Sequence, residues 1–285
     1  MSAPSTPICL EGSSGNVHPI REDDPLVIRT RATWMAGDFD RIARGFTDGA
    51  EAFITRLGVG EAERVLDVAC GTGNLALPAA RAGAWVTGVD IAPNLLETAR
   101  AYAALEDLDI RFDEGNAECL PYADGAFDTA VTMFGAMFAP RPDRAAAELR
   151  RVVRKGGRIA MANWTPDGFI GSMLRLHVAR VPAPAGVPST LLWGKEDVVR
   201  ERLAGVREVT CVRRSITFTY PCSPAETVGL FRDYYGPTVR TCAALEPAER
   251  SAFLDDLVAL WTAHNVATDG TTRVEAEYLD VLAIA

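Results

Sequence analysis

A short segment around residue 70 combines a carboxylate with closely spaced glycines. In residues 65–74 an apolar run contains Asp67, and Gly71 and Gly73 follow it in a Gly-x-Gly turn. Glycines suit such a turn because the bend is tight and because a ligand can approach a backbone that carries no Cβ atom. The helix expected behind the turn offers unpaired N–H groups to a polar or anionic group. This segment therefore predicts a binding site for a small molecule.

A second carboxylate, Asp90, ends the next apolar run, 17 residues after Gly73. In dinucleotide-binding folds an acidic side chain at this place accepts hydrogen bonds from the ribose hydroxyls. The pattern Gly71-x-Gly73-x-x-Ala76 also fits a nicotinamide or flavin site, although such a match alone is weak. Asp67 argues against a pyrophosphate, which a carboxylate would repel, and favours the cationic amino group of a methionine moiety.

The segments that must position these residues alternate between strands and helices. Strands are predicted at residues 64–69, 85–90, 109–112, 127–133 and 158–163, and helices at residues 74–81, 93–105 and 143–153. Two further strands are expected at residues 206–220 and 273–284, with helices between them. Strands separated by helices are joined by right-handed crossovers and form a doubly wound sheet. The predicted fold is therefore α/β, a Rossmann-like, mainly parallel sheet of about seven strands with a helical substrate cap.

Composition and charge narrow the classes of partner. The chain has 285 residues and a net charge of −9, which disfavours a general attraction for nucleic acid. Its one dense basic cluster, residues 150–155, is interpreted as a solvated helix end. No apolar stretch approaches the roughly 18 residues of a membrane span, and no secretory signal pattern is present. The six cysteines lack zinc-site spacing, so we expect a cytoplasmic protein without a metal, a nucleic-acid partner or a membrane partner.

Four segments in order resemble the motifs of class I S-adenosylmethionine-dependent methyltransferases. They are residues 66–73, 86–91, 114–128 and 149–157. Together they place residues 62–165 close to the small-molecule branch that includes ubiquinone- and menaquinone-biosynthesis methyltransferases. The resemblance implies S-adenosylmethionine as cofactor, S-adenosylhomocysteine as product, and a small-molecule methyl acceptor. We expect an aromatic or polyketide-like acceptor from secondary or quinone-type metabolism.

Composition, periodicity and the resemblance together predict a division of the chain into four parts. Residues 1–28 are expected to be a disordered arm, and residues 29–60 to be helices that cover the cofactor. Residues 61–165 form the S-adenosylmethionine-binding Rossmann-like domain. Residues 166–285 supply the remaining strands together with helical insertions that cap the acceptor.

Cofactor contacts can be carried over residue by residue. The implied set is Trp34, Phe39, Asp67, Ala69, Gly71, Gly73, Asn74, Asp90, Ile91, Asn116, Ala117, Glu118, Met133 and Phe134. Gly71 and Gly73 would line the methionine end, Asp90 would hold the ribose, and Ile91 would pack on the adenine. Asn116 departs from the family pattern, which usually has Asp, so we expect weaker adenine recognition there.

Candidates for acceptor chemistry are few. Methyl transfer needs a base only if the acceptor must lose a proton, and His177 and His264 are weak candidates, each interpretable as a structural histidine. Tyr234 and Tyr235 are candidate catalytic or substrate residues, and Trp164 is a substrate candidate; all three are also plausible packing aromatics. Three alternatives stay open: a nicotinamide-dependent oxidoreductase, a non-catalytic S-adenosylmethionine-binding protein, and a methyltransferase acting on RNA or protein. A homodimer is compatible with the sequence, and the methylated atom, carbon, oxygen or nitrogen, is not determined by it.

Overall fold

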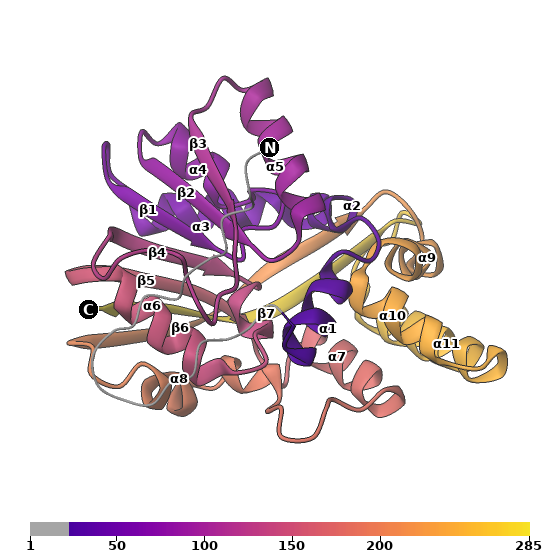
Figure 1. Cartoon of the computed structure of the whole chain (residues 1–285). Coiled ribbons are helices and arrows are strands. Elements are labelled where there is room, and N and C mark those ends of the chain that lie inside the picture. Colours follow the sequence, from indigo (N-terminus) through magenta and orange to yellow (C-terminus); the bar gives the residue numbers. More distant parts are fainter. Residues whose placement is uncertain (1–22) are drawn as a thin grey trace, which may run out of the picture.

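A single mixed sheet organises the protein, as the computed structural model of residues 23–285 shows (Figure 1). Its strand order is β3-β2-β1-β4-β5-β7-β6. Strands β1 to β5 run parallel, whereas β7 is antiparallel to both β5 and β6. The bounds are β1 Arg64–Val68, β2 Trp85–Asp90, β3 Ile110–Glu114, β4 Phe127–Met133, β5 Val153–Trp164, β6 Glu208–Tyr220 and β7 Thr272–Ile284. The predicted mainly parallel, seven-stranded Rossmann-like sheet is confirmed.

Strand β1 lies at the switch point of the sheet, because β2 and β3 are added on one side of it and β4 and β5 on the other. It pairs with β2 on one side and with β4 on the other, and its Val65, Leu66 and Val68 side chains are fully buried. A strand that is covered on both faces has a continuous apolar sequence, and this is why the strand could be predicted from the sequence. In open α/β sheets, ligands bind beyond the carboxyl ends of the strands at this switch point.

A first group of helices lies along the sheet. These are α3 Thr47–Leu57, α4 Ala76–Arg81, α5 Pro93–Leu105, α6 Pro142–Val152 and α8 Glu196–Arg202, with the short 3-10 helices η1 Arg44–Phe46, η2 Ala136–Phe138 and η3 Thr190–Gly194. The expected start of the fifth strand is wrong. β5 begins at Val153 and runs through Gly156 and Gly157, whereas these glycines were expected to precede the strand. A register shift between Phe127 and Thr129 in the pairing of β4 with β5 accommodates the extra residues.

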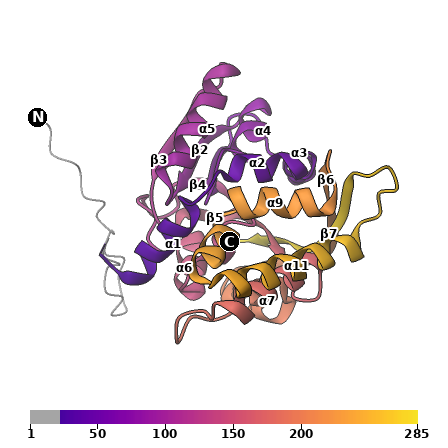
Figure 2. The same cartoon turned by 90° about the vertical axis from the view of Figure 1, so that its right-hand side faces the viewer.

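A second group of helices gathers beyond the carboxyl ends of β4 and β5 (Figures 1 and 2). It comprises α1 Pro25–Trp34, α2 Phe39–Ala43, α7 Phe169–Arg180, α9 Pro224–Tyr234, α10 Gly236–Ala244 and α11 Pro247–His264. Its interior is aromatic, because the Trp261 ring lies 4.7 Å from Phe169, 5.0 Å from Phe231 and 6.1 Å from Tyr220, centroid to centroid. Tyr220 ends β6, so this cap is anchored on the sheet itself.

Helix α1 begins inside the stretch expected to be disordered. Pro25 occupies its first turn, and Asp24 caps it by accepting a hydrogen bond from the Leu26 N–H at 2.9 Å. Aspartate followed by proline is a strong helix start, and this local signal outweighs the polar composition of the arm. The part of the predicted arm formed by residues 1–22 lies outside the described residues.

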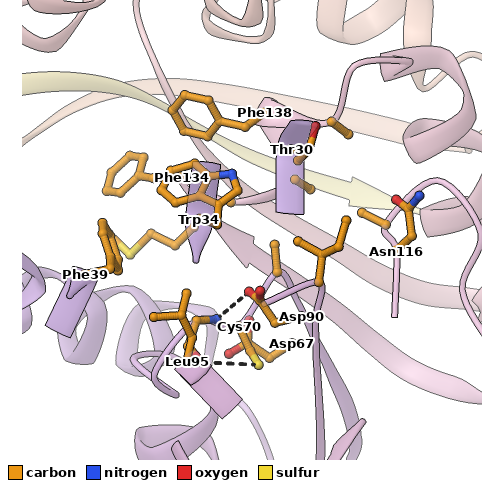
Figure 3. Close-up of a pocket in the computed structure, with 18 of the residues that line it drawn as sticks. Thr30, Trp34, Phe39, Asp67, Cys70, Asp90, Leu95, Asn116, Phe134 and Phe138 are labelled. Carbon is orange, nitrogen blue, oxygen red and sulfur yellow. Dashed lines mark hydrogen bonds between the residues drawn. The ribbon is translucent and has the colours of Figure 1, made fainter. Parts of the chain in front are cut away.

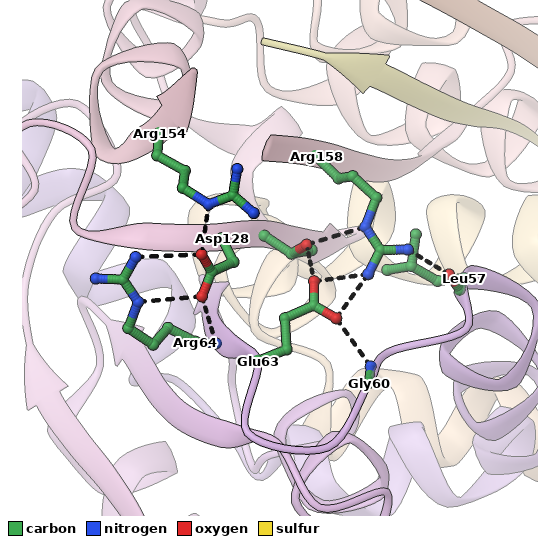
Figure 4. Close-up of polar contacts among 8 residues, drawn as sticks. Leu57, Gly60, Glu63, Arg64, Asp128, Arg154 and Arg158 are labelled. Carbon is green, nitrogen blue, oxygen red and sulfur yellow. Dashed lines mark hydrogen bonds and ion pairs between the residues drawn. The ribbon is translucent and has the colours of Figure 1, made fainter. Parts of the chain in front are cut away.

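The opposite end of the sheet is held by two carboxylates and three arginines (Figure 4). Asp128 accepts from the Arg64 side chain at 3.0 Å and from Arg154 at 2.6 Å. Glu63 accepts from Arg158 at 2.6 and 2.8 Å. These contacts join the starts of β1 and β4 to β5. They lie at the amino ends of β1 and β4, opposite the ends at which ligands bind.

Neither a cluster of metal-ligating side chains nor a membrane-spanning helix is found among the described residues. Within residues 23–285 no three His, Cys, Asp or Glu side chains are grouped so that they could hold a metal ion. In the same part of the chain, no helix has the length and apolarity needed to cross a bilayer.

Candidate functional site

A pocket opens beyond the carboxyl ends of β1, β2 and β4, where the direction of the sheet reverses (Figure 3). It encloses about 970 Å³, its open mouth included. The sheet supplies its floor, and α1 and α2 supply an aromatic wall. Most of the residues expected to contact a cofactor line it: Trp34, Phe39, Asp67, Ala69, Gly71, Asn74, Asp90, Ile91, Asn116, Ala117, Met133 and Phe134. The structure thus brings together side chains from six segments of the sequence.

The loop after β1 has a left-handed backbone at three of five residues. Ala69, Gly71 and Gly73 have φ angles of +57°, +55° and +90°. A Cβ atom on Gly71 would meet only the Phe39 ring, at 4.0 Å, so the glycine leaves the backbone open toward the pocket. Ala69 pays a steric penalty for the same geometry because it carries a Cβ atom. Backbone strain of this kind concentrates at binding and catalytic sites.

The end of β4 is strained as well and lies against the same loop. Phe134 has a φ of +55°, and a Cβ atom built on Gly135 would lie 2.7 Å from both the Cβ and the carbonyl oxygen of Ala69. Only glycine permits this close approach of the two loops. The floor of the pocket is therefore fixed by contacts between the ends of β1 and β4.

Asp90 ties the end of β2 to the glycine loop. Its two carboxylate oxygens accept the N–H groups of Gly71 at 2.9 Å and Ala92 at 2.8 Å. Burial raises the pKa of this carboxyl, and the backbone N–H groups of Ala92 and Gly71 oppose that rise. A carboxylate has about four lone-pair sites, so it can still accept from a ligand hydroxyl while it holds the loop.

Asp67 lines the pocket and carries a buried oxygen without a partner among the described residues. Its side chain is buried, lines the pocket, and its Oδ2 atom has no hydrogen-bond partner among the described residues. Burial raises the pKa of Asp67 to about 8, Asp90 adds to the rise, and an N–H of Ala76 opposes it. A buried polar atom without a partner is costly, so the site is suited to a ligand that brings a cation or a donor.

Two residues of the implied cofactor set do not line the pocket. The Gly73 N–H donates to the Cys70 carbonyl at 2.9 Å and so shapes the loop from within. The buried Glu118 carboxylate accepts the Arg141 N–H at 2.5 Å and its guanidinium at 2.8 Å. The Arg141 side chain also pairs with Asp24 at 2.5 Å. Glu118 therefore anchors the start of α1 through Arg141.

The three aromatic acceptor candidates are not among the residues that line the pocket. Trp164 is buried and stacks on Phe134 with the ring centroids 3.5 Å apart and the planes 7° from parallel. The Tyr235 ring lies 6.3 Å from Trp34 and is also buried. Tyr234 contacts Arg41, whose guanidinium lies 4.4 Å above its ring and donates to its hydroxyl at 3.2 Å. All three pack against other side chains, and none of them lines the pocket.

Neither candidate histidine lines the pocket. His177 is buried, with Nδ1 2.8 Å from the Met173 carbonyl and Nε2 2.9 Å from the Thr238 hydroxyl. Burial lowers the pKa of His177 to about 4, so its ring is neutral at physiological pH. His264 is exposed in the last turn of α11 and contacts the Leu260 carbonyl at 3.0 Å. His177 is thus held among buried protein partners, whereas His264 lies at the surface.

Some lining residues were not anticipated from the sequence. They include Val27 and Thr30 on α1, Leu95 on α5, and Phe138, Ala139 and Pro140 after β4. The consecutive residues Asp24 and Pro25 could have identified α1, because they form a helix start. The segment after β4 carried no comparable signal.

Comparison with known proteins identifies the class. Residues 65–157 match the methyltransferase domain family. The demethylmenaquinone methyltransferase of Deinococcus radiodurans is 32% identical over 222 residues, 70% of this chain and 91% of that protein. An uncharacterised protein of Mycobacterium tuberculosis is 41% identical over 224 residues, 78% of this chain and 82% of its own.

Solved structures agree on the fold. The YcgJ protein of Bacillus subtilis superposes with a TM-score of 0.57 at 20% identity, covering 83% of this chain and 98% of its own. A structure described as a methyltransferase from Bacillus halodurans gives 0.56 at 21% identity, with 82% and 97% covered. The chain belongs to the class I S-adenosylmethionine-dependent methyltransferases, and S-adenosylmethionine is its cofactor. The oxidoreductase alternative is thereby set aside.

Proposed function

We propose that this pocket binds S-adenosylmethionine with its methionine end at Asp67 and Gly71, and that the enzyme methylates a small molecule. The observation that carries the orientation is that Asp67, with a buried oxygen that lacks a partner among the described residues, lines the same pocket as the open backbone of Gly71. The amino group of the methionine moiety is a cation that would pair with this carboxylate. Such a pair would also favour the ionised form of Asp67, whose pKa burial raises to about 8.

The other end of the pocket suits the nucleoside. Asp90 retains lone pairs for the ribose hydroxyls, and Ile91 and Ala117 offer apolar surface for the adenine. The Asn116 side-chain oxygen accepts from the Glu118 N–H at 3.0 Å, which holds the amide in place. A second lone pair of that oxygen can accept from the exocyclic amine of adenine. Asn116 thus recognises the base without the charge that the family usually places there.

The residues around the reacting end align and enclose it. When bound, the cofactor supplies a methyl group that is already activated on a positively charged sulfur. Trp34, Phe39 and Phe134 line the pocket with aromatic rings, whose faces attract a cation and exclude water. Holding two reactants in the correct geometry can lower a barrier by about 7–11 kcal/mol.

The pocket offers little for general-base catalysis. The carboxylates among its described lining residues are Asp67 and Asp90, and both are proposed to contact the cofactor. Cys70 also lines it, but burial raises the pKa of this thiol well above its ordinary value. We therefore propose an aromatic or polyketide-like acceptor that is nucleophilic without help from a histidine, in secondary or quinone-type metabolism.

A polymeric acceptor is less favoured because the basic cluster at residues 150–155 is used internally. The Arg151 guanidinium lies 2.6 Å from Glu148, and that of Arg154 lies 2.6 Å from Asp128. Arg150 donates to the Ala204 carbonyl. Arginines held by these partners are poorly placed to grip a phosphate backbone.

Titration calorimetry with S-adenosylhomocysteine tests the assignment. We expect Asp67→Asn to weaken binding roughly 10- to 100-fold, because a hydrogen bond to a charged group contributes about 1.5–3 kcal/mol. Asn is close to Asp in shape, so the loop should fold as before. The matched control is Glu97→Gln, an exposed residue of α5, which should bind like the wild type. Absence of binding heat with the wild-type protein would refute the proposed site.

A further inference from the structure

A second cavity adjoins the proposed cofactor pocket across helix α1. The two share five lining residues: Thr30 and Trp34 on α1, and Phe138, Ala139 and Pro140 after β4. The rings of Trp34 and Phe138 meet edge to face with centroids 5.0 Å apart, and Figure 3 shows both at the side of the pocket away from Asp67. No residue of α1 is fully buried, so the helix is a wall with a cavity on either side.

The second cavity is a largely apolar groove between α1 and the segment that follows β5. It encloses about 1310 Å³, its open side included. Leu26 lines it from α1, Leu174 and Val178 from α7, and Val187 and Leu191 from the connector after α7. Val178 is 53% exposed, so an apolar side chain of this groove is open to solvent. A groove with this lining suits an apolar body.

The charged side chains of the groove are both arginines. Arg29 on α1 and Arg175 on α7 line it, and no carboxylate is among its described lining residues. Arg175 is held in place because it donates to the Ser172 hydroxyl at 2.9 Å and to the Pro166 carbonyl. The chain has a net charge of −9, so two arginines with no carboxylate among the described lining residues give this groove a locally positive charge. Such a pair attracts an anion.

We propose that this groove binds the methyl acceptor, and that the acceptor is an amphiphile with an apolar body and an anionic group. The anionic group pairs with Arg29 and Arg175, while the apolar body lies along Leu174 and Val178. The nucleophilic end reaches the cofactor pocket past the Trp34–Phe138 contact, the boundary that both cavities share. This inference rests on the proposed function, because it assigns the acceptor of the same site.

Simple probes of equal chain length test the charge preference. The full-length protein, saturated with S-adenosylhomocysteine, is titrated at pH 7.5 with octanoate, octylamine or 1-octanol in a calorimeter. We expect octanoate to bind about tenfold or more tightly than octylamine, since charge-assisted hydrogen bonds are the strong ones. Equal affinity for the three probes, or a preference for octylamine, would overturn the proposal.

Variants separate the groove from the cofactor site. The double variant Arg29→Ala with Arg175→Ala should lose the preference for octanoate, and Arg29→Lys with Arg175→Lys should retain most of it. Val178→Glu should abolish octanoate binding, whereas Val212→Glu, at a 41% exposed valine of β6, should not. All four proteins should bind S-adenosylhomocysteine as the wild type does. If the wild-type protein does not bind S-adenosylhomocysteine, the proposed function is refuted. If it binds S-adenosylhomocysteine but does not prefer octanoate to octylamine, this inference alone is refuted.

Discussion

At the scale of single residues, the site concentrates features that cost stability. Ala69 and Phe134 adopt left-handed backbone, and Asp67 has a buried oxygen without a partner. A folded protein tolerates such strain only when the surrounding contacts overdetermine the geometry. Here those contacts are the Asp90 hydrogen bond to Gly71 and the packing of Gly135 on Ala69.

The raised pKa of Asp67 makes cofactor binding dependent on pH. In the free enzyme the carboxyl is protonated below about pH 8. Pairing with a cationic amino group favours the ionised form, so binding at pH 7 should release close to one proton, about the amount that linkage gives for one site. Affinity should therefore rise as the pH increases toward 8. Calorimetry at pH 7 in buffers of different ionisation enthalpy measures this release.

Asp67→Asn provides the control for that proton, since the amide cannot titrate. The variant should release none, and equal release from both proteins would show that another group is responsible. The same shift affects folding: because the folded pKa lies above the unfolded one, Asp67 destabilises the free enzyme increasingly as the pH rises from about 4 to 8. The asparagine variant should lack this component of the stability–pH curve.

At the scale of elements, helix α1 lines the site with few buried contacts of its own. None of its residues is fully buried, and its first turn is fixed by the contact of Asp24 with Arg141 and, through Arg141, with Glu118. The helix nonetheless supplies lining to both cavities. Elements with few buried contacts open more readily than the core.

Weakening this tether should loosen α1 selectively. Asp24→Asn keeps a residue able to cap the helix but removes the ion pair with Arg141. We expect faster amide hydrogen exchange in residues 25–34 and S-adenosylhomocysteine affinity a few-fold lower, with the melting temperature nearly unchanged, because a half-exposed ion pair contributes about 0–1 kcal/mol. Exchange measured by mass spectrometry checks the first effect, with Glu97→Gln as the control. Unchanged exchange in α1 would show that other contacts hold the helix.

At the scale of the whole molecule, function and stability occupy opposite ends of the sheet. The pocket lies at the carboxyl ends of the strands, and the Glu63 and Asp128 ion pairs lie at the other edge. Hydrogen bonds from Arg64, together with those from Arg154, hold the pKa of Asp128 far below its ordinary range against the effect of burial. For Glu63, burial raises the pKa, but Arg158 and the Gly60 N–H outweigh it and the pKa is lowered.

Removing the Asp128 charge should change stability without changing the site. Asp128→Asn should lower the free energy of unfolding by about 1 kcal/mol, because solvent screens pairs of this exposure. A depressed folded pKa means that the stabilisation is present above the unfolded pKa near 4 and is lost as the pH falls below it. Urea unfolding at pH 7 and pH 3 should therefore show the difference shrinking at the lower pH. Weaker S-adenosylhomocysteine binding by this variant would contradict the separation.

Much of the cofactor site could be predicted from the sequence because its residues lie in short, regular segments. Asp67, Gly71 and Asp90 sit at fixed places relative to the ends of two neighbouring parallel strands, and the strand ladder brings such ends together wherever the sheet forms. Trp34 and Phe39 were expected near the cofactor only through the family resemblance, and both line the pocket. Gly73 and Glu118 were also expected to contact the cofactor, but neither lines the pocket. Both support it from behind.

The sequence by itself determined the α/β class, the order of strands and helices, and the glycine loop with its two carboxylates, because periodicity and turn chemistry are local properties. Only the tertiary structure decided which aromatic rings face the cavity and that His177 is locked against Thr238. It also decided that Arg29 and Arg175 share a groove. Those arrangements depend on how α1 and α7 pack at one end of the sheet, and side chains far apart in the chain meet there only after that packing is complete.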